Sequence, residues 1–121
     1  LKRTGYQDYT VDHGQPMILS SKARFVMSVF YSTTMMDAYY LGIPTLEYTY
    51  YDREFLKMHN NWSFAGKYCD IFIDRDKAML DEKIESLLKN EIKVHRSQEE
   101  IDREYPADNG QTLSFISSLL Q

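Results

Sequence analysis

The chain has 121 residues, enough for one domain with a single hydrophobic core. Its hydrophobic fraction of 43% and charged fraction of 26% lie in the ordinary globular range and argue against disorder. The net charge of −4, with acids and bases interspersed, argues against an extended nucleic-acid-binding face. The single cysteine, Cys69, excludes an intramolecular disulfide and favours a reducing compartment. No apolar run approaches the roughly 18–20 residues that span a bilayer.

The first part of the chain predicts a helix followed by a strand. Residues 1–15 are polar and predict a loop, or a strand around residues 9–11. Pro16 suits the first turn of a helix, which we expect over residues 17–23. Residues 25–30 form a nearly unbroken apolar run with β-branched members, which is typical of a strand covered on both faces.

The next part predicts a capped helix and a second strand. Ser32 is a good N-cap for a helix over residues 33–41. Gly42 fits the left-handed position after that helix, and Pro44 prevents its continuation. Residues 45–50 alternate and predict a strand nearer the edge of the sheet than the first. Its two faces would carry Leu46, Tyr48 and Tyr50 on one side and Thr45, Glu47 and Thr49 on the other.

The second half predicts one more strand and a long helix. Residues 53–58 suit a helical turn, and residues 71–73 form a short apolar strand. Asp74 or Asp76 can cap a helix that ends at Lys89. The apolar stripe of this helix would be Met79, Leu80, Ile84, Leu87 and Leu88.

Two further helices are predicted at the end of the chain. Ser97 and Glu100 form a capping-box pattern for a short helix that would run to about Tyr105. A last helix would open at residues 108–111, with Leu113, Ile116 and Leu120 on one side. The order of elements predicts a single α/β domain over residues 1–121, built on a small parallel sheet.

The turn after the first strand is where we expect chemistry. In an open α/β sheet, anionic ligands bind where the carboxyl end of a strand leads into a helix N-terminus. Ser32, Thr33 and Thr34 are small hydroxyl residues that let a phosphate approach the free N–H groups of the helix. Asp37 lies one turn further and suits a pair of vicinal hydroxyls, such as those of ribose. The competing interpretation is structural: Ser32 is only a cap, and Thr34 and Asp37 are surface residues that bind nothing.

Other polar residues give weaker signals. Arg53 follows the second strand and suits a diphosphate at the same edge, or else a surface ion pair with a neighbouring acid. The histidines lack metal-ligand spacing, so no metal is expected, and a loop histidine is more often solvated than an acid or base. They are His13, His59 and His95. Cys69 is interpreted as a buried apolar residue. The pattern assigns no catalytic residue.

The run from residue 23 to residue 45 resembles the C-terminal, nucleotide-binding half of GT-B glycosyltransferases. The relevant pattern is an apolar strand, a turn of small residues, an acid, alanine and then Leu-Gly-x-Pro. The matching positions are Ser28, Ser32, Thr33, Thr34, Asp37, Ala38, Leu41, Gly42 and Pro44. The similarity is greatest to bacterial surface-polysaccharide and polyol-phosphate transferases and to nucleotide-sugar 2-epimerases. It covers about residues 16–90, with residues 72–88 matching the strand and helix that usually follow.

This resemblance implies a three-layer Rossmann-like domain, equivalent to one half of a GT-B fold. The donor would be a nucleotide-diphosphate sugar, with no other cofactor. Its phosphates would be held by Ser32, Thr33 and Thr34, its ribose by Asp37 and its diphosphate also by Arg53. The acid at position 37 is Asp in this chain, whereas Glu is more common in the family. The Asp37 side chain is therefore one methylene shorter than the usual one.

The resemblance also implies a partner domain. Because the chain begins at Leu1 and the catalytic base of such enzymes is on the N-terminal domain, we expect the C-terminal part of a longer protein, inactive alone. That protein would act in surface glycan biosynthesis, on a glycan or lipid-linked acceptor. We expect it to be cytoplasmic, with any membrane association coming through the full-length protein.

Two alternatives remain open at this point. One is a nucleotide-sugar 2-epimerase half-domain, which would need carboxylates and a histidine from the other domain. The other is a non-catalytic α/β module that binds a protein partner through the tyrosine-rich residues 48–51, extended by Tyr39 and Tyr40.

Overall fold

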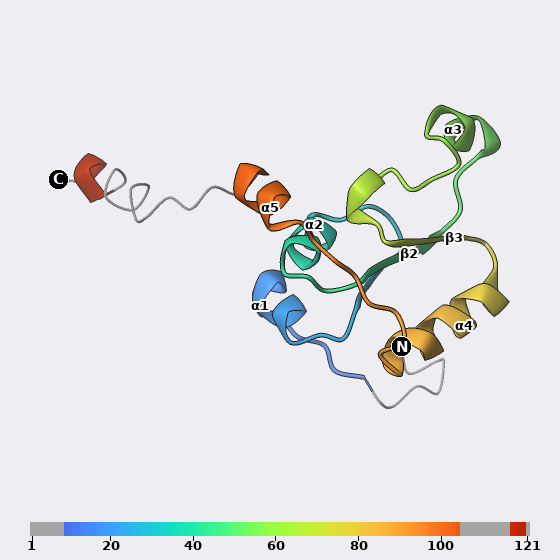
Figure 1. Ribbon diagram of the computed structural model, residues 1–121, viewed down its shortest axis with the longest axis horizontal. Helices are drawn as coiled ribbons and strands as arrows, with labels where there is room; N and C mark the ends of the chain where they lie inside the picture. Colours follow the sequence, from blue (N-terminus) through green and yellow to red (C-terminus); the bar gives the residue numbers. More distant parts are fainter. Residues whose placement is uncertain (1–8, 105–116, 121) are drawn as a thin grey trace.

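The computed structural model describes residues 9–104 and 117–120 and shows a mixed α/β domain (Figure 1). The elements in chain order are α1 (Pro16–Ser21), β1 (Val26–Ser28), α2 (Thr33–Tyr40), β2 (Thr45–Thr49), α3 (Arg53–Met58), the short 3-10 helix η2 (Gly66–Tyr68), β3 (Ile71–Asp74), α4 (Lys77–Leu88) and α5 (Gln98–Glu104). The predicted α/β class with a small parallel sheet is therefore confirmed. Residues 9–15 form no strand, and the start of the predicted last helix lies outside the described residues.

The sheet has three strands in the order β1-β2-β3, and both pairings are parallel. Val26 pairs with Thr45, and Leu46 with Ile71. Parallel neighbours need crossover connections, which α2 supplies between β1 and β2, and α3 with η2 between β2 and β3. The carboxyl ends of all three strands therefore lie along one side of the sheet. We call this row of strand ends the carboxyl edge and the opposite row the amino edge; neither term refers to an outer strand.

Two expectations about the strands are wrong. The second strand is central, not nearer the edge, and its supposed polar face is buried: Thr45 and Glu47 are 0% exposed. The first strand is the outer one and is not covered on both faces, since Met27 is 47% exposed. Alternation of polar and apolar residues normally marks a half-solvated strand. Here the polar side chains of β2 are buried because strands on both sides and elements on both faces enclose it.

Two apolar clusters pack on residues that alternate along the strands. Leu46 and Ile73 pack on α4 through Leu80 and Leu87. The other cluster joins α2 to the segment before β3 and contains Met35, Ala65 and Cys69, with Phe72 packed against it. Because Leu46 pairs with Ile71 while Glu47 pairs with Phe72, the two clusters use opposite faces of the strands.

The helix ends follow the predicted caps. Ser32 caps α2 by accepting a hydrogen bond from the Thr34 N–H at 3.3 Å. Asp76 caps α4 through the Met79 N–H at 3.0 Å, and the helix ends before Lys89 as predicted. Gly42, after α2, has φ +74, the left-handed conformation expected of it. The predicted stripe of α4 is only partly buried, since Met79 is 43% exposed.

Candidate functional site

A pocket of about 420 Å³ lies at the carboxyl edge of the sheet, and we call it the edge pocket. Three segments that are distant in sequence form its wall: the turn between β1 and α2, the end of β2 and the residue after β3. The lining residues are Val29, Phe30, Tyr48, Thr49, Tyr50 and Arg75. The carboxyl edge of a parallel sheet is where open α/β folds bind ligands.

Arg75 is the cation of the edge pocket. It follows β3 in a left-handed conformation, with φ +61, and its N–H donates to the Thr49 carbonyl at 3.1 Å. Its guanidinium lies 5.1 Å from the centre of the Tyr50 ring, and its Nη2 donates to the Tyr51 carbonyl at 3.0 Å. Nε also lies 3.5 Å from Asp74. The side chain keeps 60% of its surface exposed, so it is oriented by these contacts and still open to an anion.

Thr49 also lines the edge pocket, but its hydroxyl is buried, and its side chain points to the opposite face of β2 from Tyr48 and Tyr50. The residue is 5% exposed, and its Oγ1 has no hydrogen-bond partner among the described residues. A buried hydroxyl without a partner costs free energy, and most buried polar groups do have one. Thr49 is therefore the polar group of this wall that the described part of the fold leaves unsatisfied.

Aromatic rings form the apolar part of the same edge. Phe30 is 55% exposed and Tyr50 is 65% exposed. Phe30 contacts the Tyr51 ring edge-on at 6.1 Å, and Tyr51 in turn stacks on Phe55 at 4.4 Å. The exposed guanidinium of Arg75 lies over the Tyr50 ring, and Phe30 lines the same pocket, a surrounding that suits a ligand with both charged and planar parts.

None of the predicted site residues lines this pocket. Ser32, Thr33 and Thr34 lie directly after its Phe30 wall, at the start of α2, and Thr33 is exposed. Ser32 Oγ is engaged as the cap, as the structural interpretation expected. Neither Asp37 nor Arg53 belongs to the pocket wall.

Asp37 and Arg53 are placed elsewhere. Asp37 lines a second groove of about 350 Å³ between α1, α2 and α5, together with residues that include Met17, Tyr40 and Ile101. Arg53 is the exposed first residue of α3. The structure therefore brings Arg75, and not Arg53, to the wall beside the predicted turn.

Arg75 and Glu47 were not predicted as functional residues from the sequence. Attention at the third strand went to its acids, Asp74 and Asp76, although a basic residue directly after that strand must lie at the same edge as the β1–α2 turn. That position was a usable signal for Arg75. Glu47 had no such signal, because the alternation of β2 placed it on a polar face.

The amino edge of the sheet carries a denser polar network. Arg96 pairs with Asp70 through two hydrogen bonds of 2.9 and 2.7 Å, and their side chains are 8% and 15% exposed. Asp70 Oδ2 also accepts from the Thr45 N–H at 2.9 Å. The Arg96 guanidinium lies 3.9 Å from the centre of the Tyr39 ring. Every strong donor here has a partner, so this network fixes structure.

The remaining candidates show no chemistry. Cys69 is 3% exposed, and burial, followed by the charge of Glu47, raises its thiol pKa to about 12. That agrees with a buried, unreactive residue. Within residues 9–104 and 117–120, no three His, Cys, Asp or Glu side chains gather as metal ligands would. In the same residues, no helix has the length and apolarity to cross a membrane.

Comparison with family models, with curated proteins and with solved structures gives no match for this chain. The edge pocket itself is therefore the basis for any statement about function.

Proposed function

We propose that the chain is the donor-binding half of a GT-B-type glycosyltransferase and that the edge pocket takes the nucleotide-diphosphate part of a sugar donor. The supporting observation is that one pocket joins Arg75 to the turn before α2 and to the end of β2. The pattern of residues from Ser32 to Pro44 adds the resemblance to that family. A three-layer arrangement, half of a GT-B fold, belongs to the same proposal.

The chemistry of a diphosphate fits these groups. Partial positive charge gathers at the start of α2, where the N–H groups of Thr34 and Met35 already donate to Ser32. Arg75 offers a planar fork of donors that matches two phosphate oxygens. Exposed rings of Phe30 and Tyr50 supply flat apolar surface for a base. The resemblance assigns Asp37 to ribose, but Asp37 lines the groove between α1, α2 and α5, so the proposal does not use it in the edge pocket. The proposal places no catalytic group on this chain.

Isothermal titration with a panel of nucleoside diphosphates tests the proposal, since it measures binding and not turnover. We expect one member of the panel to bind, and the Arg75→Gln variant to bind it about ten-fold or more weakly, because a charge-assisted pair is lost. The matched control is Arg53→Gln, an exposed arginine outside the pocket, which should bind as the unsubstituted chain does. Absence of heat with every diphosphate, on a folded sample, would remove the proposal.

A second candidate is a module that binds a protein partner. The observation in its favour is the exposure of large apolar side chains around the carboxyl edge, such as Phe30, Tyr50, Phe64 and Met58. Tyr51 does not support it, because its hydroxyl donates to buried Glu47. The module predicts no response to nucleotides and loss of partner binding in Tyr50→Ser, so the same titration separates the two candidates.

A further inference from the structure

Glu47 is a fully buried carboxylate in the middle of the central strand β2. It is 0% exposed and forms no ion pair with a described lysine, arginine or histidine. Its Oε1 accepts from the Tyr51 hydroxyl at 2.5 Å, and its Oε2 accepts from the Ser63 hydroxyl at 2.7 Å. A buried carboxylate is costly unless its hydrogen bonds are strong, so these two donors have to stay in place.

The two donors lie at the two ends of residues 51–63, a segment that contains α3 and that we call the excursion. Tyr51 is the second residue after β2, and Ser63 comes after α3 and the turn that contains Asn60 and Asn61. Figure 1 shows α3 projecting beyond the sheet. No residue of α3 is buried, so its packing contributes little to holding the excursion. Glu47 therefore ties both ends of residues 51–63 to the central strand through one carboxylate.

The first of these ends also touches the edge pocket. The Tyr51 carbonyl accepts from Arg75 Nη2 at 3.0 Å, and the Tyr51 ring contacts Phe30 edge-on at 6.1 Å. Phe30 and Arg75 both line the pocket. A shift of Tyr51 would consequently move the cation and one aromatic wall together.

We infer that Glu47 is a positioning residue for the edge pocket: it anchors Tyr51 and Ser63, and Tyr51 in turn orients Arg75. The ligand of the pocket rests on the function proposed above, whereas the anchoring of the excursion does not. Glu47 itself touches no ligand in this scheme.

The Tyr51→Phe variant tests this inference because it removes one hydrogen bond and keeps the ring and the Glu47 carboxylate. The first measurement is the labelling rate of Cys69 by a thiol reagent. Cys69 is the only cysteine and packs beside Ala65, close to the Ser63 end of the excursion. We expect labelling about ten-fold faster, since a hydrogen bond to a charged group is lost. Because the charge of Glu47 contributes to the raised thiol pKa of Cys69, the rates are measured over a range of pH, so that opening of the excursion is distinguished from a change in thiol ionisation.

The second measurement is the dissociation constant for the nucleoside diphosphate that binds the unsubstituted chain. We expect it to rise about ten-fold in Tyr51→Phe. In the separate variant Glu47→Gln we expect a smaller rise, because glutamine keeps one acceptor oxygen. Tyr9→Phe is the matched control, because Tyr9 is an exposed tyrosine outside the edge pocket and outside residues 51–63, and it should change neither measurement. Ser63→Ala should repeat the faster labelling from the other end of the excursion.

The outcomes are distinguishable. Unchanged labelling in both Tyr51→Phe and Ser63→Ala would overturn the anchoring role. Faster labelling with an unchanged dissociation constant would overturn the positioning role, because the excursion would then move without affecting the pocket. If no diphosphate binds the unsubstituted chain, the proposed ligand fails and the positioning role fails with it, while the labelling rates still decide the anchoring.

Discussion

The two ends of strand β2 carry the same residue type in opposite situations. At the amino edge, the Thr45 hydroxyl donates to the Tyr68 carbonyl at 2.5 Å and accepts from the Asp70 N–H at 3.0 Å. At the carboxyl edge, the Thr49 hydroxyl is equally buried and has no partner among the described residues. A group that stabilises a fold has its partners within the chain. The Thr49 hydroxyl has no such partner among the described residues, so it contributes no hydrogen bond to the stability of the fold.

The arginines of the two edges also differ in how fully they are paired within the chain. Arg96, at the amino edge, is 8% exposed and makes a two-point pair with Asp70. Arg75, at the carboxyl edge, is 60% exposed and meets Asp74 only at 3.5 Å. The first arginine is committed to the fold, and the second keeps donors available. Of these two arginines, the one at the carboxyl edge is the one with donors left for a ligand.

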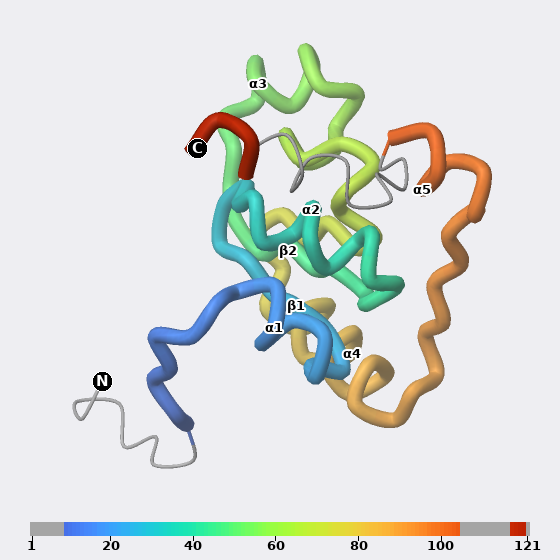
Figure 2. Tube along the Cα trace, turned by 90° about the vertical axis from the view of Figure 1, so that its left-hand side faces the viewer, coloured from blue at the N-terminus to red at the C-terminus, as the bar shows by residue number. Residues whose placement is uncertain are grey.

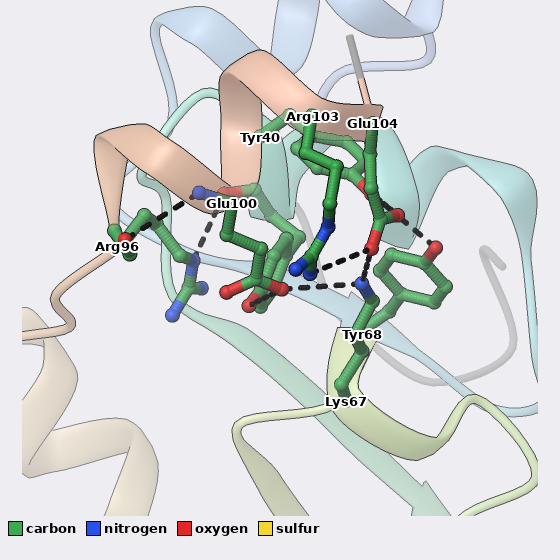
Figure 3. A network of polar contacts seen from close by, with 9 residues as sticks. Tyr40, Lys67, Tyr68, Arg96, Glu100, Arg103 and Glu104 are labelled. Carbon is green, nitrogen blue, oxygen red and sulfur yellow. Dashed lines mark hydrogen bonds and ion pairs between the residues drawn. The ribbon is translucent and has the colours of Figure 1, made fainter.

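The amino edge also holds the helix α5, through the network drawn in Figure 3. Lys67 pairs with Glu100 at 3.1 Å and with Glu104, and the Tyr40 hydroxyl donates to Glu104 at 2.5 Å. Figure 2 shows the chain after α4 running along one side of the domain to reach α5. No described residue of α5 is buried, so polar contacts and not apolar packing hold this helix.

Breaking the pair at the amino edge should have the largest effect. Asp70→Ala leaves Arg96 and the Thr45 N–H without their acceptor, and we expect a loss of about 3–5 kcal/mol in the free energy of unfolding. Urea denaturation measures it. Asp81→Ala is the control, because its pair with Lys77 is exposed, and it should cost at most about 1 kcal/mol. Equal losses in the two variants would contradict the structural role of the amino edge.

The paired threonines sharpen the comparison directly. Thr45→Val removes a satisfied hydroxyl and should lower the free energy of unfolding by about 1–3 kcal/mol. Thr49→Val removes a hydroxyl with no bond to lose, so we expect a change within about 0.5 kcal/mol or a small gain. The two substitutions have the same shape and lie on the same strand, which makes each the control for the other. A similar loss in both would show that Thr49 has a partner in the folded chain.

The smallest expected effect is a loosening of α5 at acidic pH. The Lys67 ammonium holds the pKa of Glu100 and of Glu104 below the ordinary glutamate value, with Tyr40 adding to the effect at Glu104. A lowered pKa in the folded state stabilises above the ordinary value of about 4.3, and the stabilisation is lost as the pH falls through the lowered pKa. Hydrogen exchange of α5 should therefore accelerate on acidification, and with added salt at neutral pH.

Two variants distinguish the loss of the ion pairs between Lys67 and α5 from a general effect of acid on the protein. Glu104→Gln should accelerate exchange in α5 at neutral pH already. Glu85→Gln removes a comparable exposed pair with Lys89 on α4 and should leave the exchange of α5 unchanged. Identical exchange of α5 in Glu104→Gln and in the unsubstituted chain would mean that other contacts hold the helix.

Features decided within a few residues could be predicted. Ser32, Asp76 and Gly42 form helix ends through hydrogen bonds and backbone angles within one turn, so sequence spacing was enough to locate them. The parallel sheet also followed from the order of helices and strands. The prediction at the turn was of the same local kind: it located Ser32, Thr33 and Thr34, and their role as ligands stays a prediction.

The placement of β2 and the composition of the edge pocket depended on the tertiary structure. Sequence alone determined the α/β class, the helix ends and the turn before α2, because these depend on near neighbours. Only the fold decided that β2 is central, that Glu47 is buried between Tyr51 and Ser63, and that Arg75 stands beside Phe30. Strand order and crossover connections bring those residues together, and no local periodicity encodes which strand lies in the middle.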